Sequence, residues 1–403
     1  MPRSLMLLGG IRYLIPVIKA ARERGYRVIT ADYLPGNIAH AYSDEYVNVS
    51  ITDREAVLEA ARRCRIDGIM SFGVDPGVVS AAYVQEKLGL PSFGPLRSVE
   101  ILQKKDAFRD FLTRNGFNVP RHASFSSPDE ALSACGSFRY PVIVKPTDSA
   151  GSKGVSRVDG PEALPAALRE AFAHSLKGRV IVEEFIERAG FSSDSDSFSV
   201  DGRLSVVNFN AQRFDPDAPN PYVPSAYTWP SGFTPAQESA FAADIQRLLN
   251  LLEMKTSLYN IEVRMGTDGL PYLMELTPRG GGNRLSELIR LSTGADMITA
   301  VTRYVVGDGF EVPCARQPEG YWAEIILHSP VAGRFRSLWL HPDLRPYVVE
   351  EDLWVRPGDA VRAFKGANDT IGTLILHFPE RKLMEEVVAH QDAWIQVKTE
   401  NQS

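Results

Sequence analysis

The chain has 403 residues, of which 44% are hydrophobic, and a net charge of −6 at neutral pH. This length exceeds that of one ordinary domain, so we expect two or three domains with cores of their own. The negative balance argues against a broadly basic nucleic-acid surface and permits a local cationic pocket.

The cysteines and the apolar runs indicate the compartment. Cys64, Cys135 and Cys314 are widely separated and match no disulfide or metal-ligand spacing, so we expect reduced thiols. The apolar run from Leu5 ends at Leu8, and no stretch approaches the roughly 20 apolar residues of a membrane span. We therefore expect a soluble, cytoplasmic protein without a membrane partner.

The first 97 residues alternate strand and helix patterns. Strands are predicted at 4–8, 27–32 and 68–72, and helices at 13–24, 53–63 and 76–88. Such alternation predicts a parallel, Rossmann-like sheet with helices on its faces. Gly9 and Gly10 follow the first strand and Asp32 ends the second, as in a dinucleotide site, but the turn lacks the Gly-x-Gly-x-x-Gly spacing.

A second region, 98–306, opens with elements that suit an anion. The helix predicted at 98–116 carries three basic residues, which are Lys104, Lys105 and Arg109. The strand 140–146 delivers Lys145, and a loop of small residues, 147–154, follows it. Small residues let backbone N–H groups approach an anion, and the Lys145 ammonium adds a charge. The loop lacks P-loop spacing, and an ordinary turn beside a solvated lysine is an equally good interpretation.

The next elements add a second possible ligand contact and a loop. The strand 179–186 ends in a mixed acidic and apolar run, which suits an adenine edge, although an interior strand with a charged end fits equally well. Asp201 and Gly202 predict a hairpin turn. The stretch 213–232 is polar and rich in proline and tyrosine, so we expect a lid or substrate loop. A helix is predicted at 234–254.

A second hairpin carries two opposed glutamates. Asp268 and Gly269 predict a two-residue type I′ turn between alternating apolar runs. The pairs of this register are Thr267 with Leu270, Ile261 with Leu276, Val263 with Met274, and Met265 with Tyr272. On the other face of the hairpin, Glu262 lies opposite Glu275.

Two carboxylates opposed on paired strands repel each other, so a cation is expected between Glu262 and Glu275. Mg²⁺ shared with substrate phosphates suits a site with few protein ligands. Arg279 follows closely and can stabilise a transferring phosphoryl group. Two solvated glutamates on an exposed face are the alternative. We favour a magnesium nucleotide site.

The rest of the chain is predicted to form two helices and a small α+β region, 307–403. The helices are expected at 283–292 and 294–306. Strands are expected at 321–328, 347–350, 360–364 and 373–378, and a last helix at 383–390.

In their order along the chain, these pieces resemble the ATP-grasp superfamily of carboxylate–amine ligases. The matching features are Gly9 and Gly10 with Asp32, Lys105, the segment 142–146, the loop to Gly154, the segment 182–186, Glu262 before Val263 and Arg264, and Glu275 before Thr277 and Arg279. The branch it resembles contains L-amino-acid ligases and phosphoribosylglycinamide synthetases. The resemblance implies a multidomain α/β and α+β fold: a Rossmann-like domain (1–97), an ATP-grasp domain (98–306, with a flap subdomain at about 119–190) and the C-terminal region (307–403).

The resemblance also implies a role for each matching residue. Lys105 and Lys145 would contact ATP phosphates, with Lys104 as a competitor for the first role. Gly151 and Ser152 would cover the phosphates as a flap. Adenine would be held by Glu183, Glu184, Phe185 and Ile186, chiefly through main-chain groups of Glu184 and Ile186. Magnesium, as two ions, with manganese as an alternative, would be bound by Glu262, Glu275 and Thr277. Arg279 and Lys145 would be catalytic.

Thr277 is a departure, because the family usually has asparagine two residues after the second metal glutamate. A threonine hydroxyl can still ligate magnesium or hold a water, so we expect altered coordination at one ion. Candidate substrate contacts are Arg213, Tyr227, Arg264, Asn283 and Arg284, each of which could equally be solvated or structural.

The implied activity is ligation of a small carboxylate, an amino acid above all, to an amine through an acyl phosphate, with release of ADP and phosphate. A phosphoribosylamine–glycine ligase is the alternative enzyme, and a nucleotide-binding regulator without chemistry is the alternative of another class. The partners are the carboxylate and the amine, with no nucleic acid, and a homodimer is expected.

Overall fold

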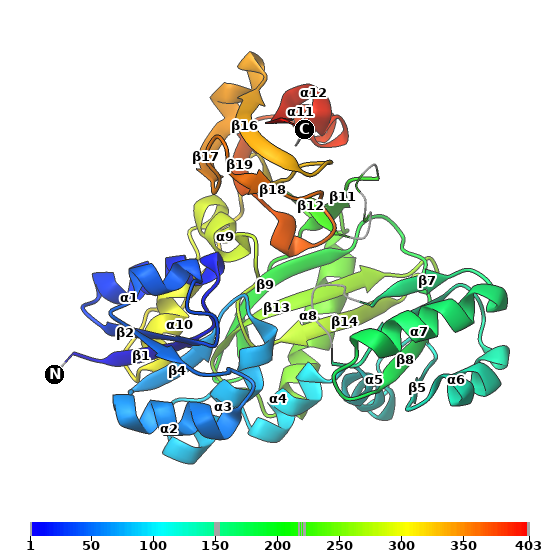
Figure 1. Ribbon diagram of the computed structural model, residues 1–403, viewed down its shortest axis with the longest axis horizontal. Coiled ribbons are helices and arrows are strands. Elements are labelled where there is room, and N and C mark those ends of the chain that lie inside the picture. Colours follow the sequence, from blue (N-terminus) through cyan, green and yellow to red (C-terminus); the bar gives the residue numbers. More distant parts are fainter. Residues whose placement is uncertain (1, 149–153, 217, 219, 221–222, 401–403) are drawn as a thin grey trace. The chain divides into compact units, whose positions relative to one another are not determined.

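The computed structural model describes residues 2–148, 154–216, 218, 220 and 223–400. They form two compact units (Figure 1). Unit 1 comprises Met1–Ala189, Ser195–Asn208 and Pro235–Arg316, and unit 2 comprises Gly190–Asp194, Phe209–Thr234 and Gln317–Ser403. The mixed α/β and α+β class is confirmed, while the domain boundaries predicted from the sequence stay predictions.

Unit 1 begins with the predicted parallel sheet. Its strand order is β3-β2-β1-β4, and all three pairings are parallel. The strands are β1 (Ser4–Leu8), β2 (Arg27–Asp32), β3 (Glu45–Asn48) and β4 (Gly68–Ser71), and the helices are α1 (Ile15–Glu23), α2 (Arg54–Cys64) and α3 (Val78–Leu88). Strand β3 was not predicted, because this edge strand buries a single residue, Val47, and shows no apolar run.

The carboxyl edge of this sheet is occupied by the chain's own β2–β3 loop. The Asp32 carboxylate accepts hydrogen bonds from the Leu34 N–H at 3.2 Å and from the Asn37 side chain at 2.9 Å. A Cβ atom on Gly10 would lie 2.5 Å from Asn37 and 2.6 Å from the His40 ring. Asp32 is thus engaged within the protein, which agrees with the absence of a dinucleotide spacing.

The helix predicted at 98–116 is two helices, α4 (Leu96–Gln103) and α5 (Lys105–Arg114). The prediction of one helix is wrong because Lys104 is extended, with φ −112° and ψ 113°. No glycine or proline marks this break. Its consequence is that Lys105 begins a new helix, half-buried, whereas Lys104 is exposed.

The second sheet of unit 1 is antiparallel, in the order β5-β8-β6-β7. Its strands are β5 (His122–Phe125), β6 (Val142–Pro146), β7 (Ser156–Val158) and β8 (Val180–Glu184), and its helices are α6 (Pro128–Ala134) and α7 (Leu164–His174). Valines alternate along β6 and β8 and bury one face against these helices. The opposite face carries Lys145 and Glu183.

The third sheet has the order β10-β9-β13-β14. Its strands are β9 (Ser193–Val200), β10 (Arg203–Val206), β13 (Ser257–Met265) and β14 (Pro271–Thr277), accompanied by α8 (Pro235–Leu251), α9 (Leu285–Thr293) and α10 (Met297–Val305). The hairpin predicted between β9 and β10 is confirmed, because Asp201 and Gly202 both have positive φ and Val200 pairs with Arg203.

The β13–β14 hairpin keeps the predicted glutamate pair but not the predicted turn. Glu262 pairs with Glu275, after which a bulge shifts the register by one residue. The predicted pairs of Val263 with Met274 and of Met265 with Tyr272 are therefore wrong; the observed pairs are Val263 with Leu273, Arg264 with Tyr272, and Met265 with Pro271.

The turn itself is a three-residue loop. The Gly266 N–H donates to the Leu270 carbonyl at 2.9 Å, and only Gly269 of the loop has positive φ, so a two-residue type I′ turn is excluded. An Asp-Gly dipeptide is compatible with a two-residue and with a three-residue hairpin loop. The three-residue loop shifts the register by one residue, and the bulge after Glu262 restores the pairing of Glu262 with Glu275.

Unit 2 contains a five-stranded sheet, β11-β12-β15-β19-β17, and a three-stranded sheet, β18-β16-β20. The strands are β11 (Ala211–Phe214), β12 (Pro224–Trp229), β15 (Tyr321–Leu327), β16 (Gly333–Leu340), β17 (Val348–Leu353), β18 (Ala360–Val361), β19 (Gly372–Phe378) and β20 (Ile395–Glu400), and the helices are α11 (Arg381–Ala389) and α12 (Gln391–Trp394).

The expectation of an irregular loop over all of 213–232 is wrong, because this stretch includes strand β12, while its role as a lid or substrate loop stays a prediction. Ala226, Tyr227 and Trp229 are buried there. Both faces of the strand are covered, so the polar and apolar alternation that reveals a half-exposed strand is missing.

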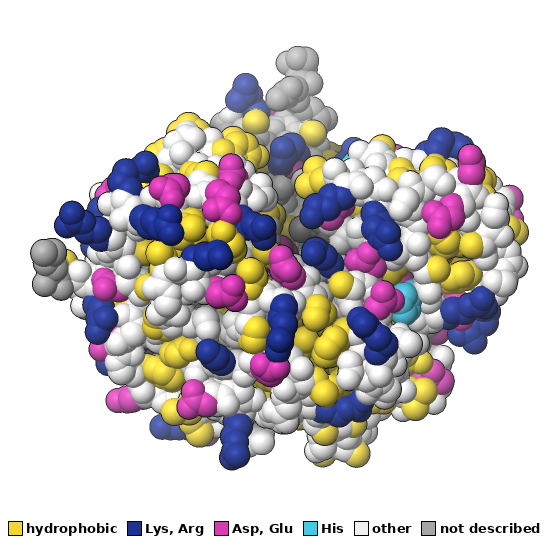
Figure 2. All heavy atoms as spheres, turned by 90° about the horizontal axis from the view of Figure 1, so that it is seen from below, with side chains coloured by type: hydrophobic (Ala, Val, Ile, Leu, Met, Phe, Trp, Pro, Cys, Tyr) yellow, Lys and Arg dark blue, Asp and Glu magenta, His cyan; other side chains and the backbone are white. Residues whose placement is uncertain are grey.

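None of the described helices has the length and apolar character needed to cross a membrane. Figure 2 shows one face of the molecule, where lysine and arginine side chains are interspersed with aspartate and glutamate. This mixture agrees with the modest net charge.

Candidate functional site

A buried ionic cluster joins α5 to strands β6 and β8 in unit 1. Lys145 Nζ lies 2.6 Å from Glu183 Oε2, and Arg109 Nε donates to Glu183 Oε1 at 2.8 Å. Arg109 also donates to the Leu273 carbonyl of β14 at 3.2 Å. Both carboxylate oxygens of Glu183 are therefore held by cations.

The two cations of this cluster keep the Glu183 carboxylate ionised. Burial alone would raise the pKa of Glu183, but Arg109 and Lys145 outweigh it and lower that pKa to about 2. Burial lowers the pKa of the Lys145 ammonium, with Glu183 opposing the shift and Arg109 and Lys105 adding to it. One carboxylate thus faces two cations, and a further anion would relieve the excess positive charge.

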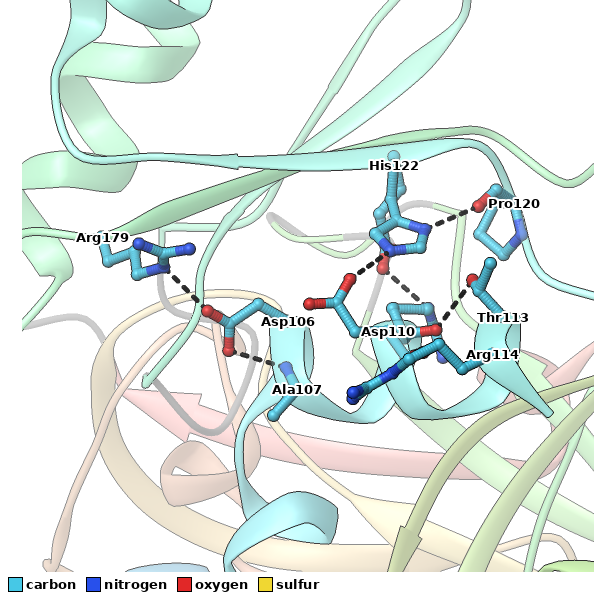
Figure 3. A network of polar contacts seen from close by, with 10 residues as sticks. Asp106, Ala107, Asp110, Thr113, Arg114, Pro120, His122 and Arg179 are labelled. Carbon is cyan, nitrogen blue, oxygen red and sulfur yellow. Dashed lines mark hydrogen bonds and ion pairs between the residues drawn. The ribbon is translucent and has the colours of Figure 1, made fainter.

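Helix α5 is fixed by the polar network of Figure 3. Arg179 donates to the Asp106 carboxylate at 2.7 Å, and Asp106 accepts the Ala107 N–H at 2.9 Å at the start of the helix. His122 of β5 lies 3.2 Å from Asp110 (Figure 3). Lys105 begins this anchored helix, and its N–H donates to the Thr147 carbonyl at 3.5 Å. This contact places the start of α5 beside Thr147, two residues after Lys145.

The segment 183–186, which was expected to hold adenine, forms several contacts within the protein. The Glu183 side chain belongs to the ionic cluster, and its backbone pairs with β5 and β6. The Glu184 N–H donates to Arg121, the Phe185 N–H donates to Pro141, and the Ile186 carbonyl accepts from Arg264. These contacts use the Glu184 N–H and the Ile186 carbonyl, and they do not involve the Glu184 carbonyl or the Ile186 N–H.

Glu262 and Glu275 face each other on β13 and β14, and both are half-buried. Burial and the like charge of Glu275 raise the pKa of Glu262, while Arg264, 3.8 Å away, lowers it. The charges of Lys145 and Arg109 also lower the pKa of Glu262, so the glutamate pair lies within the electrostatic field of the ionic cluster.

Thr277 lies two residues after Glu275, which places both side chains on the same face of β14. Its hydroxyl is buried and has no hydrogen-bond partner among the described residues. Among those residues, no three histidine, cysteine or acidic side chains gather as a complete metal site. Two carboxylates and an unused hydroxyl fit a hard cation whose remaining ligands come from substrate phosphates and water.

Arg279 is held by Asp75, which lies in the short helical turn after β4 of unit 1. Its Nε and Nη2 atoms lie 2.7 and 2.6 Å from Asp75 Oδ1, and Nη1 donates to the Gly280 carbonyl at 3.0 Å. The side chain is 9% exposed. Its guanidinium is thus fixed before any ligand binds.

The glycine segment, residues 280–282, packs where side chains do not fit. A Cβ atom on Gly280 would lie 2.2 Å from the Phe72 ring, and one on Gly281 would lie 2.8 Å from Asn260. The Gly73 N–H donates to the Gly280 carbonyl at 3.0 Å. These contacts fix the segment against the turn after β4.

The predicted substrate residues of unit 1 have protein partners. Tyr13 donates to Asn283 Oδ1 at 2.9 Å, and Arg284 forms an ion pair with Glu287 at 2.8 Å. Arg264 binds the Ile186 carbonyl at 3.2 Å.

The other two predicted substrate residues, Arg213 and Tyr227, belong to unit 2. Arg213 pairs with Glu385 at 2.8 Å and lies 3.7 Å above the Phe191 ring, and Tyr227 donates to Asp194 at 3.2 Å. Their assignment as substrate contacts stays a prediction. Gly151 and Ser152 of the expected flap lie outside the described residues.

Three residues of the site were not predicted. Arg109 was noted only as a helix residue, and Asp75 and Asp196 not at all. Asp196 is fully buried and contacts Gly281. The acid-serine alternation along β9 is the one signal that could have drawn attention to Asp196, because a buried strand rarely carries ionisable residues.

Part of this chain is similar to a known domain family. Residues 138–287 match the family model described as ATP-grasp domain. The formate-dependent phosphoribosylglycinamide formyltransferase of Synechococcus sp. (strain WH7803) is 32% identical over 189 residues, which is 46% of this chain and 48% of that protein. The carbamoyl phosphate synthase large chain of Thermotoga neapolitana is 25% identical over 292 residues, 72% of this chain and 26% of that protein. The chain spans about half the length, or less, of these relatives.

Solved structures match over nearly the whole chain. An L-amino acid ligase from Bacillus licheniformis has a TM-score of 0.81 at 20% identity and covers 99% of both chains. A phosphoribosylglycinamide synthetase from Anaerococcus prevotii has a TM-score of 0.78 at 19% identity, covering 99% of this chain and 100% of that one. The biotin carboxylase domain of a 2-oxoglutarate carboxylase from Hydrogenobacter thermophilus, solved with MgADP and bicarbonate, has a TM-score of 0.77 at 15% identity, covering 99% and 91%. At these identities the likeness establishes the fold.

Proposed function

Because residues 138–287 belong to the ATP-grasp domain family, we propose that this protein is an ATP-dependent carboxylate–amine ligase. It activates a small carboxylate, an amino acid above all, as an acyl phosphate and joins it to an amine, releasing ADP and phosphate. The observation that supports this most is the opposed pair Glu262 and Glu275 beside the cations Lys145 and Arg109.

ATP is proposed to lie along β8 and β6. Lys105 and Lys145 neutralise its phosphates, with Gly151 and Ser152 over them. An adenine edge presents a donor at N6 and an acceptor at N1, which complement the carbonyl of Glu184 and the N–H of Ile186. The Glu184 N–H and the Ile186 carbonyl already form hydrogen bonds within the protein. We therefore propose only the Glu184 carbonyl and the Ile186 N–H as adenine contacts.

We propose that Glu262, Glu275 and Thr277 would bind magnesium, as two ions, with manganese as the alternative metal. When bound, the metal neutralises phosphate charge and aligns the reacting oxygens. Arg279, fixed by Asp75, stabilises the charge that develops when the substrate carboxylate attacks the γ-phosphate. The amine then attacks the acyl carbon and phosphate leaves.

Arg213, Tyr227, Arg264, Asn283 and Arg284 are proposed to contact the substrates. A homodimer in the cytoplasm that uses neither nucleic acid nor membrane is the proposed working state. A phosphoribosylamine–glycine ligase is the second candidate, because relatives at 32% and 31% identity are named formate-dependent phosphoribosylglycinamide formyltransferase, which is an enzyme of related substrates.

The test is phosphate release from ATP in the presence of pools of amino acids, other small carboxylates and amines, with glycinamide ribonucleotide and formate as a separate pool. Mass spectrometry of the condensed product identifies the substrates. The proposal predicts turnover with one pool. It fails if ATP binds and no pool stimulates phosphate release, which would favour a regulator.

Replacement of Glu275 by glutamine should abolish magnesium-dependent turnover, because it removes a charged metal ligand while keeping the shape of the side chain. The folded state is checked by circular dichroism. Turnover at the wild-type rate would contradict the metal assignment.

A further inference from the structure

Asp196 is a buried carboxylate that joins three segments of unit 1. Its Oδ1 atom accepts the Gly281 N–H at 2.8 Å and the Asn260 side chain at 3.3 Å. Its Oδ2 atom accepts the Ser286 hydroxyl. The residue is 0% exposed, so these contacts replace all of its hydration.

These contacts connect the metal face to the glycine segment. Asn260 lies two residues before Glu262 on β13, and it pairs with Thr277 of β14. Gly281 lies two residues after Arg279. Asp196 is also close enough to Arg279 for their charges to interact.

We propose that Asp196 is a positioning residue for the ligase reaction: its negative charge fixes the glycine segment and the Arg279 guanidinium against the metal-binding face. This inference rests on the proposed function. Asp75 binds the Arg279 guanidinium from the short helical turn after β4, and Asp196 holds the backbone at Gly281, so Arg279 is constrained at its side chain and along its chain.

A purely structural role would not require a charge at this position. Burial raises the pKa of Asp196 to about 6, so the ionised form at neutral pH is maintained against a desolvation cost. Asparagine has the same shape and could keep the Gly281 contact, and the Ser286 hydroxyl can accept a hydrogen bond as well as donate one. A neutral isostere would therefore fill the site at lower cost.

The decisive variant is Asp196→Asn. We expect a melting temperature no lower than that of the wild type and a kcat roughly 10- to 100-fold lower, because the contact to the segment no longer involves a charged acceptor and is weaker. KM for ATP should change less than threefold. Amide exchange of the peptide covering residues 280–284 should become faster, which reports the segment directly and without turnover.

The matched control is Asp201→Asn, on the exposed turn of the same hairpin. Asparagine tolerates the left-handed conformation of residue 201, so only a charge is removed. Its kcat and amide exchange should equal those of the wild type. A lowered melting temperature for Asp196→Asn with unchanged kcat per folded molecule would overturn the proposal and leave Asp196 a structural residue.

If Asp196→Asn does not fold, Ser286→Ala addresses the same question. It removes one donor and leaves the carboxylate in place, and we expect a kcat roughly 3- to 10-fold lower. An unchanged kcat would contradict the inference. Absence of wild-type turnover with every substrate pool is a failure of the proposed function, and the exchange measurement then still decides whether Asp196 holds the segment.

Discussion

At the scale of single residues, Glu183 shows how burial and charge together define a role. Its sequence context suggested adenine contact, whereas its carboxylate is enclosed by Lys145 and Arg109. Removing one member of a buried ion pair leaves the other uncompensated, which costs more than the pair contributes when intact.

Glu183→Gln should lower the free energy of unfolding at neutral pH by about 3–5 kcal/mol. The folded-state pKa of Glu183, about 2, lies below its ordinary value of 4.5. Its stabilisation is therefore complete above the ordinary value and is lost as pH falls toward 2. Urea unfolding of the wild type across this range should show the loss, and the variant should not. Glu184→Gln, at a half-buried neighbour, should stay within about 1 kcal/mol of the wild type.

Thr277→Val tests the hydroxyl that has no hydrogen-bond partner among the described residues. Without ligand, we expect stability equal to the wild type or higher by about 1–3 kcal/mol, because an unpaired buried polar group is removed. Affinity for magnesium with ATP should fall. The measurement is the shift in melting temperature on titration with magnesium and ATP.

Thr302→Val is the control for that experiment. Its hydroxyl, on α10, is likewise buried without a described partner and lies outside the proposed site. The gain in stability should be similar and magnesium binding unchanged. Equal magnesium binding in both variants would mean that Thr277 is no ligand.

At the scale of elements, patterns that repeat were predicted and single irregularities were not. The alternation of β1, α1, β2 and α2 predicted the parallel sheet, and the facing of Glu262 and Glu275 followed from counting along one hairpin. The break at Lys104 carries no local signal. The bulge after Glu262 depends on tertiary packing.

The candidate site was predictable to a similar extent. Residues that carry a spacing, such as Lys145 and Arg279, were found, whereas Asp75 reaches Arg279 across 204 positions of sequence. Such a contact exists only once the fold brings both segments together. Strand β12 was missed because burial on both faces removes the alternation on which strand prediction depends.

Gly280→Ala tests the packing of the glycine segment. The added methyl would lie 2.2 Å from the Phe72 ring, so overpacking should cost about 1–3 kcal/mol and displace Arg279. The melting temperature and kcat should both fall. Adding Phe72→Leu to the variant should recover part of the loss.

Gly136→Ala is the matched control, because nothing lies within 4 Å of the added methyl and its φ is not positive. Its stability should equal or slightly exceed that of the wild type. A Gly280→Ala variant that behaves like this control would show that the contact with Phe72 is not restrictive.

At the scale of the whole molecule, charge is distributed without a dominant basic face in the view of Figure 2. With a net charge of −6, polyanion binding would have to rely on a local patch. We expect no retention on heparin at about 0.15 M salt, where exposed charges are screened beyond about 8 Å. Retention that persists at this salt concentration would indicate a polyanion site that the proposed function does not include.

The order of strands in unit 2 has a consequence during synthesis. Strand β12 pairs with β15, which follows it by about 90 residues in the chain. At about 5–20 residues per second, a ribosome delivers that partner roughly 5–20 s after β12 has emerged. Tyr227 and Trp229 are buried in the finished sheet, and β15 cannot cover them during this interval. The five-stranded sheet of unit 2 can therefore form only after β15 and β19 have been synthesised.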